Sequence, residues 1–324
     1  MKKLLKKIRE LKVLIIGDLI LDHYIWGDAS RISPEAPVPV IEVDHDSYAA
    51  GGAANVALNV NALGASAEIC GILGDDDSGH QLRNILTECN VPIDDAFILS
   101  NRQTVLKTRI IVRQQQLCRL DRESTPADYK IDIEKHKEIL IEKVKAADAV
   151  IFSDYAKGVI DGAIINLVQE AAKINNTLVT YDPKPKGNVV FGEVDILKPN
   201  RTEALELAGI QVGPHDEYPA AQICESIWKQ YHPRYLIISL GADGMLLSEK
   251  GKIITQIPTY AREVFDVSGA GDSVIASLTT AMAAGSTIEE AVHFANTAGG
   301  VVVGKVGAAV AYPSEIIEYA ASHE

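Results

Sequence analysis

The chain has 324 residues, 47% of them hydrophobic, and its 31 lysines and arginines against 44 aspartates and glutamates give a net charge of −13. This length and apolar content can bury one large core. The acidic balance excludes a general nucleic-acid surface, which needs a basic face. An anionic ligand must therefore be held by local groups and not by the overall field of the protein.

The cysteines and the first residues indicate a compartment. The four cysteines are scattered, with no Cys-x-x-Cys pair and no histidines at metal-ligand spacing, which is typical of buried free thiols in a reducing compartment. The basic start is followed by an apolar run, 13–16, too short for the core of a signal peptide, and no run approaches a membrane span. We therefore expect a cytoplasmic protein without membrane insertion, whose residues 1–11 form a short amphipathic helix docked on the body.

Strand-like apolar runs alternate with helical patterns along most of the chain. The predicted strands are 13–17, 68–73, 149–153, 178–181, 196–198 and 235–239. The predicted helices lie near 53–63, 78–88, 133–146, 160–174 and 216–230. Continuous apolar strands separated by helices are typical of a mostly parallel α/β sheet covered on both faces. Such sheets bind ligands beyond the carboxyl ends of their strands.

Two segments depart from this alternation. Residues 22–50 combine an aromatic run with a proline-rich turn region, and residues 103–122 contain two β-like stretches around 113–116. Both are interpreted as strands of a small second sheet that forms a lid over the site. The sequence contains no internal repeat, low-complexity tract or linker, so we expect residues 1–324 to form a single domain with lid segments near 22–50 and 103–122.

The most informative motif is the run Asp-Val-Ser-Gly-Ala-Gly-Asp-Ser at residues 266–273, which enters an apolar helical pattern. A glycine-rich turn at a helix start leaves backbone N–H groups unpaired, and together with the helix dipole they form a site for a phosphate-like anion. Asp272 places a carboxylate base beside that site, as phosphoryl transfer to a hydroxyl requires. By itself the run is more typical of a capped helix with an acidic first turn, and the rest of the chain changes that weighting.

Two motifs near the first predicted strand suggest a hydroxyl-rich ligand. Gly51 and Gly52 allow another group to approach the backbone closely, and Asn55 offers an amide. Asp18 and Asp22 follow the first strand, where carboxylates face the ligand crevice of a parallel sheet. Tight helix–sheet packing and turn or helix capping are the structural alternatives.

Two later motifs suggest a nucleotide. Asn200 and Glu203 form a helix N-cap with its capping-box partner, which the local sequence favours, or a Mg²⁺–phosphate site. Ser239, Gly241 and Gly244 follow a strand and lead to a short hairpin, where the glycines border a nucleotide or only make the turn.

Other motifs argue against rival functions. Residues 299–306 nearly match a P-loop, but Val306 replaces the hydroxyl residue that would bind Mg²⁺, so we reject that match. No Gly-x-Gly-x-x-Gly follows the first strand, which weakens a dinucleotide-binding interpretation. The basic groups that could lie near a sugar phosphate are Arg109, Arg113, Lys157, Lys184 and Lys186.

Taken together, these motifs occur in the order of the ribokinase-like (phosphofructokinase-B type) sugar kinases, which the chain resembles from about residue 11 to 318. Within that family, residues 31–40, 113–116 and 153–158 resemble the D-glycero-β-D-manno-heptose-7-phosphate kinases. The resemblance implies a three-layer α/β sandwich with a β lid that often helps to form a homodimer. Some relatives carry a fused nucleotidyltransferase domain; because this chain stops at Glu324, we expect that second activity to be absent.

The resemblance also implies roles for individual residues. Asp272 would be the base, and residues 269–271 (Gly269, Ala270, Gly271) the anion hole. Residues 200–203 would lie on the ATP phosphates and Mg²⁺, with Glu203 acting directly or through water. Nucleotide contacts are further expected at Ser239, Gly241, Gly244 and Asn296. Sugar contacts are expected at Asp18, Asp22, Gly51, Gly52 and Asn55.

Three points remain around this assignment. Ser268 and Ser273 replace the threonines of many sugar kinases but keep the hydroxyl. By family likeness, Asp266 and nearby carbonyls would house a monovalent cation such as K⁺, although nothing local requires one. Because the net charge repels a sugar phosphate, its phosphate needs a dedicated cationic pocket, for which we expect Arg109 and Lys184, with Lys157 as a further substrate contact.

The sequence therefore predicts an ATP- and Mg²⁺-dependent kinase that phosphorylates the anomeric hydroxyl of heptose 7-phosphate, for ADP-heptose and lipopolysaccharide core synthesis. The nearest alternative is a ribokinase-like kinase of another sugar or sugar phosphate, such as fructose 1-phosphate. Alternatives of other classes are a non-catalytic sugar- or nucleotide-sensing protein, against which the intact Gly-Ala-Gly-Asp motif counts, and a dinucleotide-dependent oxidoreductase.

Overall fold

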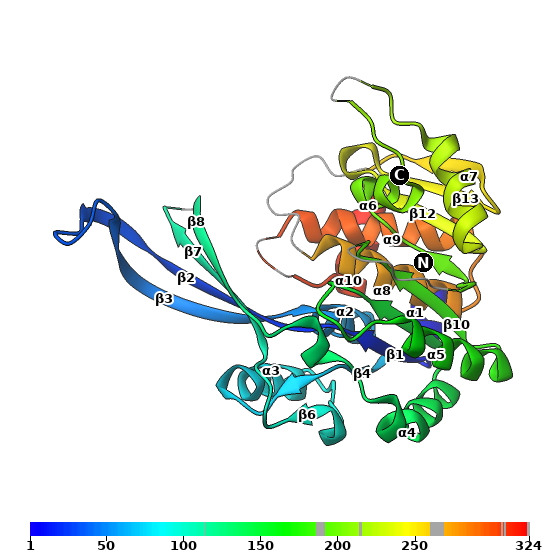
Figure 1. Cartoon of the computed structure of the whole chain (residues 1–324). Helices are drawn as coiled ribbons and strands as arrows, with labels where there is room; N and C mark the ends of the chain where they lie inside the picture. The colour runs from blue at the N-terminus through cyan, green and yellow to red at the C-terminus, as the bar shows by residue number, and fades with distance from the viewer. Residues whose placement is uncertain are drawn as a thin grey trace.

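The computed structural model describes residues 1–113, 115–185, 192–213, 216–259, 269–305, 307 and 309–322. Its largest element is an eight-stranded sheet, in which six neighbouring strands are parallel and two antiparallel strands extend one edge (Figure 1). From the parallel edge the strands are β4 (Ser66–Cys70), β1 (Lys12–Gly17), β9 (Ala149–Ser153), β10 (Leu178–Asp182), β11 (Ile196–Leu197), β12 (Tyr235–Ser239), β13 (Met245–Glu249) and β14 (Lys252–Ile257).

Helices cover both faces of this sheet because its central strands are apolar on both sides. Val13 and Ile15 of β1 belong to one buried cluster, whereas Leu14 and Ile16 belong to the other, as alternation along a strand requires. The first cluster includes buried residues of α1 (Lys2–Ile8), α2 (Ala53–Ala62), α3 (Asp77–Glu88), α8 (Ala270–Ala283), α9 (Ile288–Val303) and α10 (Pro313–Ala321). The second includes those of α4 (Ile133–Ala146), α5 (Gly162–Asn175), α6 (Arg201–Ala208) and α7 (Ala220–Tyr231). The predicted three-layer α/β architecture is thus confirmed.

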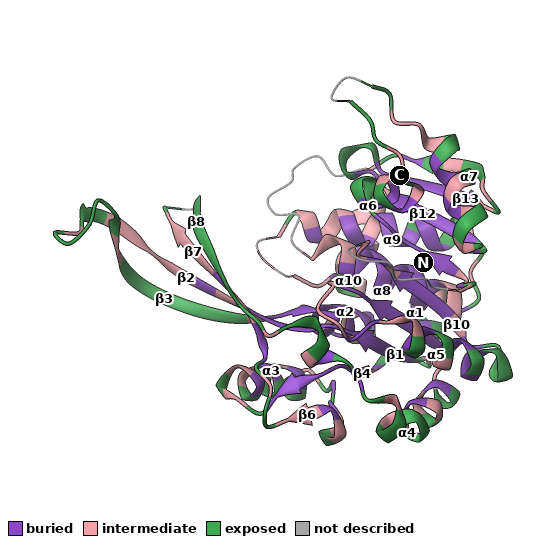
Figure 2. Ribbon diagram, viewed as in Figure 1, coloured by how far each residue is buried: buried purple, intermediate pink, exposed green. Residues whose placement is uncertain are grey.

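A second, four-stranded sheet confirms the β lid. Its order is β3-β2-β7-β8, and its strands are β2 (Leu19–Ile32), β3 (Pro39–Gly52), β7 (Val105–Val112) and β8 (Gln115–Arg122). The long β2–β3 ribbon projects away from the body (Figure 1). Strand β8 and most of β3 are exposed (Figure 2), so the lid presents open surface where the main sheet is covered.

The local predictions hold with two differences. The amphipathic start is helix α1, which buries Leu5 and Ile8 against the body. The predicted strand 68–73 is wrong beyond Cys70, where β4 ends. Leu73 instead belongs to β5 (Leu73–Gly74), which pairs with β6 (Ile98–Leu99). Helix α10 was not predicted.

None of the helices within the described ranges has both the length and the apolar content needed to span a membrane. Short 3₁₀ turns complete the secondary structure of those ranges at Asp95–Phe97, Pro126–Tyr129 and Gly241–Asp243.

Candidate active site

A cavity of about 810 Å³ lies beyond the carboxyl ends of β10, β11 and β12. The start of α8 forms one wall, through Gly269, Ala270, Gly271 and Asp272. The position agrees with the rule that parallel sheets bind ligands at this edge. The residues expected on the nucleotide also line this cavity, namely Asn200, Glu203, Ser239, Gly241, Gly244 and Asn296.

Asp272 lies in the first turn of α8 with its carboxyl group buried and held from two sides. The Asn55 amide donates to its Oδ2 (2.7 Å), and the Tyr155 hydroxyl donates to its Oδ1 (2.5 Å). Burial raises the pKa of Asp272, although the bonds from Tyr155 and Asn55 and the charge of Lys198 oppose the rise. The helix is preceded by Gly269, whose φ of 77° lies in the left-handed region that favours glycine. A buried carboxylate thus stands in the first turn of a helix that a left-handed glycine precedes.

Asp18 organises the loop that brings Tyr155 to this site. Its carboxylate accepts hydrogen bonds from the backbone N–H groups of Tyr155 (2.8 Å), Lys157 (3.0 Å) and Val159 (3.0 Å). Burial raises its pKa, and these three bonds oppose the rise. Asp18 is only 1% exposed. In this arrangement its carboxylate stabilises the loop and is not open to a sugar.

Asp22 and Arg109 form a pair where the lid joins the body. Their charged atoms are 2.5 Å apart, and the guanidinium also lies over the Tyr24 ring, 5.2 Å from its centroid. Gly51 and Gly52, at the end of β3, lie so close to neighbouring atoms that a side chain at either position would collide with them. A Cβ on Gly51 would lie 2.4 Å from the Asp22 carboxylate, and one on Gly52 would lie 2.4 Å from the Asp18 carbonyl oxygen.

The other predicted substrate cations are also paired with carboxylates. Lys157 bonds Glu123, and Lys184 donates to Glu203 at 2.8 Å. Sequence reasoning missed Lys107, which has no ion-pair partner among the described residues and lies 5.7 Å from the centroid of the Tyr155 ring. Burial lowers the pKa of Lys107. Its position at i−2 from Arg109 on one strand was the signal that could have identified it.

At the start of α6, the predicted capping box is confirmed. The Glu203 N–H donates to the Asn200 side chain (2.9 Å), and the Asn200 N–H donates to Oε2 of Glu203 (2.9 Å). Because Lys184 bonds Oε1, both carboxylate oxygens are engaged. Asn296, which also lines the cavity, donates to the Pro258 carbonyl oxygen (2.9 Å).

Two further charged residues of the cavity were missed. Lys198 and Asp182 pair at 3.0 Å beside the α8 turn. Asp266, expected at a monovalent cation, lies outside the described residues, as does Lys186. Within the described ranges, no group of three or more histidine, cysteine and acidic side chains is arranged to hold a metal ion.

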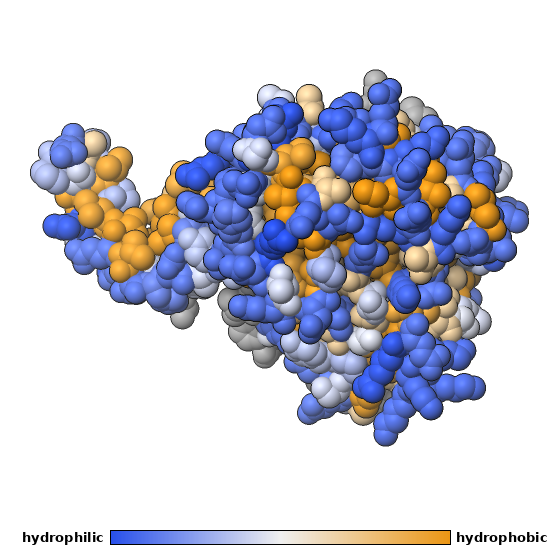
Figure 3. Space-filling view, turned by 90° about the horizontal axis from the view of Figure 1, so that it is seen from below, coloured by the Kyte–Doolittle hydropathy of each residue, from blue (hydrophilic) through white to orange (hydrophobic). Residues whose placement is uncertain are grey.

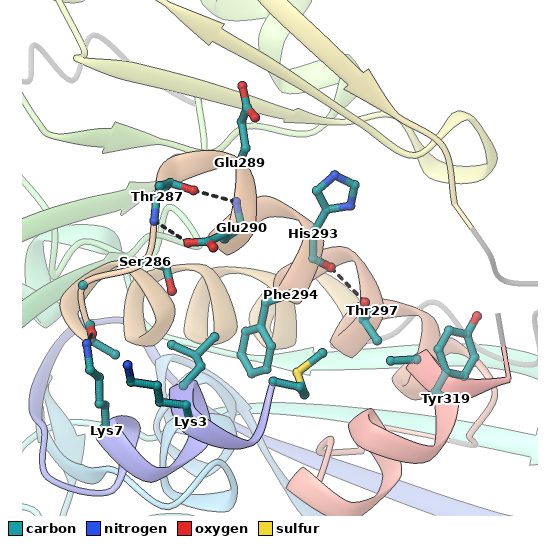
Figure 4. Close-up of a pocket in the computed structure, with 15 residues that line it drawn as sticks. Lys3, Lys7, Ser286, Thr287, Glu289, Glu290, His293, Phe294, Thr297 and Tyr319 are labelled. Atoms are coloured by element: carbon teal, nitrogen blue, oxygen red, sulfur yellow. Dashed lines mark hydrogen bonds between the residues drawn. The ribbon is translucent and has the colours of Figure 1, made fainter. Parts of the chain in front are cut away.

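A second hollow, of about 850 Å³, lies between α1, the start of α9 and α10 (Figure 4). Its polar groups serve local helix structure: Thr287 and Glu290 form a capping box, and the Thr297 hydroxyl bonds the His293 carbonyl. It contains neither the glycine-rich turn nor the buried carboxylates, so the cavity beside Asp272 is the candidate active site.

Comparisons with known proteins agree with this geometry. A family model described as "pfkB family carbohydrate kinase" matches residues 10–315. "Bifunctional protein HldE" of Helicobacter hepaticus is 42% identical over 311 residues, which are 95% of this chain and 63% of that protein. The chain therefore spans less than two thirds of the length of this relative.

Solved structures show the same fold. The ribokinase of Arabidopsis thaliana complexed with ribose and ATP has a TM-score of 0.74 at 22% identity, covering 95% of this chain and 98% of that one. Phosphofructokinase-2 from Escherichia coli in complex with substrates and products has a TM-score of 0.76 at 20% identity, covering 97% and 100%. With the ribokinase-like fold and a family match over most of its length, this chain belongs to the pfkB family of carbohydrate kinases.

Proposed function

We propose that this sugar kinase uses ATP and Mg²⁺ to phosphorylate the anomeric hydroxyl of D-glycero-β-D-manno-heptose 7-phosphate, giving the 1,7-bisphosphate for ADP-heptose and lipopolysaccharide core synthesis. The observation that carries the chemistry is Asp272, a buried carboxylate directly behind the Gly269–Gly271 turn. The substrate assignment is supported by the segments at 31–40, 113–116 and 153–158, which resemble heptose-7-phosphate kinases.

In this reaction Asp272 takes the proton of the sugar hydroxyl. The hydroxyl oxygen forms a bond to the γ-phosphorus, the bond to the β,γ-bridging oxygen breaks, and ADP leaves with that electron pair. The Asn55 amide and the Tyr155 hydroxyl keep the carboxylate in place. The N–H groups of the turn face the charge that develops on the transferred phosphoryl group.

The chemistry of the nucleotide corner fits Mg²⁺. Glu203 offers a largely buried carboxylate and Asn200 an amide oxygen, and oxygen ligands together with substrate phosphates are what Mg²⁺ usually takes. When bound there, the ion would neutralise phosphate charge. Lys184 would have to share or release Oε1 of Glu203 for direct coordination, whereas coordination through water leaves that bond in place.

Glu203→Gln tests this metal role. Glutamine keeps the capping geometry but loses the charge, so the Mg²⁺ concentration for half-maximal rate should rise about tenfold, while the cap, worth about 1 kcal/mol, is retained. Glu290→Gln in the equivalent capping box of α9 is the matched control. A variant whose thermal stability falls while its Mg²⁺ dependence stays unchanged would leave Glu203 with the capping role alone.

The substrate phosphate would bind where the lid meets the body. Lys107 and Arg109 are two residues apart on β7, and Asp22 and Tyr24 are their register partners on β2. Arg109 shares its charge with Asp22, whereas Lys107 has no described ion-pair partner. We therefore place Lys107 beside Arg109 in this pocket and move Lys184 to the nucleotide side, where its partner Glu203 lies.

Substitutions in the lid test the pocket. Arg109→Ala and Lys107→Met should each raise KM for heptose 7-phosphate strongly and KM for ATP little. Each substitution removes one cation, a planar guanidinium or an ammonium group, that would contact only the sugar phosphate. Arg83→Ala, which removes an exposed arginine of α3 that pairs with Asp95, is the control. Unchanged preference for the 7-phosphate over free heptose in both variants would refute the pocket.

We also propose that the lid helps to form a homodimer. Large apolar side chains are exposed on it, and they gather along the projecting arm (Figure 3). These residues are Ile32, Val38, Val43, Tyr48, Leu117 and Leu120. A second copy of the chain would remove them from water and cover the open edges β3 and β8.

A coupled ADP-release assay tests the function as a whole. Heptose 7-phosphate should be turned over with the highest kcat/KM in a panel that includes free heptose, ribose, fructose and fructose 1-phosphate. Highest activity on another sugar would assign this kinase to that substrate. Activity on free heptose equal to that on the 7-phosphate would contradict the phosphate pocket.

A further inference from the structure

We propose that Lys198 is a catalytic residue whose ammonium group binds the transferring γ-phosphoryl group, and that Asp182 is the positioning residue that holds it. The inference rests on the proposed roles of Asp272 and the Gly269–Gly271 turn in phosphoryl transfer. Neither residue was singled out by its sequence context.

Sheet topology brings the two residues together. Asp182 ends β10, and Lys198 directly follows β11, which pairs with β10 in parallel. Both side chains therefore leave the same edge of the sheet and line the cavity. Lys198 Nζ lies 3.0 Å from Asp182 Oδ2, and the Lys198 side chain is only 3% exposed. The Lys198 N–H also donates to the Tyr181 carbonyl (2.9 Å), which fixes its backbone.

The ammonium group lies at the anion-binding turn. A Cβ built on Gly271 would lie 3.7 Å from Lys198 Nζ and 4.0 Å from Asp182 Oδ2. Glycine at this position keeps the space between the cation and the first turn of α8 open. Asp272, the next residue, feels the charge of Lys198. The cation thus stands between the proposed base and the nucleotide corner at Asn200 and Glu203.

The donor count leaves room for a ligand. An ammonium group has three donors, and among the described residues Asp182 is the side chain that pairs with Lys198. The remaining donors are available to an oxygen atom that enters the cavity. Lys184, the other lysine of the cavity, is less suited because it is 39% exposed and bonds Glu203.

Stability alone does not account for the pair. A buried ion pair generally contributes little net stability, because desolvation offsets the attraction. Burial raises the pKa of Asp182 to about 7, and the Glu203 and Asp272 carboxylates add to the rise while Lys198 opposes it. A pKa that is shifted by burial and by neighbouring charges is typical of functional sites.

Lys198 keeps its proton throughout and donates hydrogen bonds to a non-bridging oxygen of the transferring group. Asp272 takes the sugar proton, the sugar oxygen bonds to the γ-phosphorus, and ADP leaves with the electron pair of the broken bond. Because the group passes through a loose transition state, a preorganised cation at its oxygens lowers the barrier.

The test compares Lys198→Met and Lys198→Arg in the full chain. The Met variant should lose about 10²–10³-fold in kcat, the usual scale for one oxyanion donor, with the sugar KM changed less than about threefold. Its affinity for a non-hydrolysable ATP analogue should fall at least about tenfold more than its affinity for ADP, since only the analogue carries the γ-phosphate. The Arg variant should recover part of kcat. Lys143→Met, which removes another largely buried, ion-paired lysine, is the control and should keep wild-type kcat.

A double-mutant cycle tests Asp182. If Asp182 acts by holding Lys198, Asp182→Asn lowers kcat in the wild-type background but adds little in the Lys198→Met background. Near-wild-type kcat in Lys198→Met, or equal loss of affinity for ADP and for the ATP analogue, would overturn the proposal. If Lys198→Met fails to fold, the affinities for ADP and for the ATP analogue are compared in Lys198→Arg and Asp182→Asn instead. A ratio of these two affinities that is unchanged from wild type in both variants would contradict the proposal.

The test of Lys198 does not depend on which sugar is the substrate. Nucleotide affinities require no sugar, and the kcat arm uses whichever sugar of the panel the wild-type protein phosphorylates. Failure on heptose 7-phosphate would remove the substrate assignment and leave the Lys198 test intact.

Discussion

The cavity beside Asp272 and the lid use polar side chains in different ways. Asp272 in the cavity and Asp18 beneath the Tyr155 loop are buried, and each accepts hydrogen bonds from groups far away in the sequence. In the outer lid, Arg113 and Arg119 are exposed and pair with aspartates on the same or the adjacent strand. Polar groups are buried and bonded to distant segments in the first region, and they are exposed with nearby partners in the second.

The difference follows from what each sheet is packed against. The main sheet lies between two helical layers, so a carboxylate at its edge is desolvated and must be bonded to remain there. The lid has no helical layer over β8 or most of β3 (Figure 2). We infer that the body performs the chemistry and that the lid recognises the substrate, so that body variants change kcat and lid variants change KM or assembly.

The largest effect is expected for Asp272→Asn. Loss of the base should lower kcat by about 10²–10⁴-fold, while nucleotide affinity is largely kept. Turnover by coupled ADP release and nucleotide affinity by calorimetry measure the two quantities. Asp28→Asn, an exposed lid aspartate, is the control, and near-wild-type turnover in Asp272→Asn would exclude it as the base.

Tyr155→Phe should lower kcat by roughly 10–100-fold, since a hydrogen bond to a charged group contributes about 1.5–3 kcal/mol. The Tyr155 hydroxyl lowers the pKa of Asp272, so its removal raises that pKa further. The acid limb of the kcat/KM profile should therefore move to higher pH. Tyr129→Phe, which removes a hydroxyl bonded to the Gln103 carbonyl, should leave the limb in place. An unmoved limb in Tyr155→Phe would contradict the coupling.

Asp154→Asn should change how stability depends on pH. Burial, together with the charge of Asp18, raises the pKa of Asp154 to about 6 from its ordinary 3.8. Between these values the folded state binds more protons than the unfolded state, so this group's contribution to the free energy of unfolding falls as pH rises through that window and is constant above it. The free energy of unfolding of the variant should not show this decrease. Between pH 5 and pH 8 it should therefore rise, relative to that of the wild type, by on the order of 1–2 kcal/mol. Urea unfolding at both pH values measures it, and a parallel pH dependence in both proteins would argue against the raised pKa.

The smallest effect is expected in the lid. Leu120 on β8 is 58% exposed, so Leu120→Ser should leave kcat unchanged. If a second copy covers β8, the substitution should weaken dimerisation by about 1 kcal/mol, or about fivefold in the dissociation constant. Sedimentation velocity over a range of concentrations measures this. Identical sedimentation of variant and wild type would place any dimer contact elsewhere.

Much of the fold could be predicted because it depends on local patterns. The apolar run at Val13–Ile16 is a strand covered on both faces, and the Asn200–Glu203 capping box forms as its spacing indicates. The strand predicted through residue 73 ends at Cys70, and Leu73 pairs instead with Ile98, a pairing that no local pattern records. The turn at Gly269 was likewise readable, since a left-handed residue before a helix favours glycine.

The sequence by itself thus determined the sheet, the lid strands and the turn that precedes Asp272, because backbone conformation responds to residues a few positions away. Tertiary structure alone decided the surroundings of that carboxylate. Asn55 and Asp272 are 217 residues apart, and Tyr155 reaches Asp272 only because Asp18 holds its loop. Likewise, Lys198 meets Asp182 because β11 lies next to β10. Which cations are paired and which face the cavity depends on strand order and burial, and neither is encoded in the residues on either side.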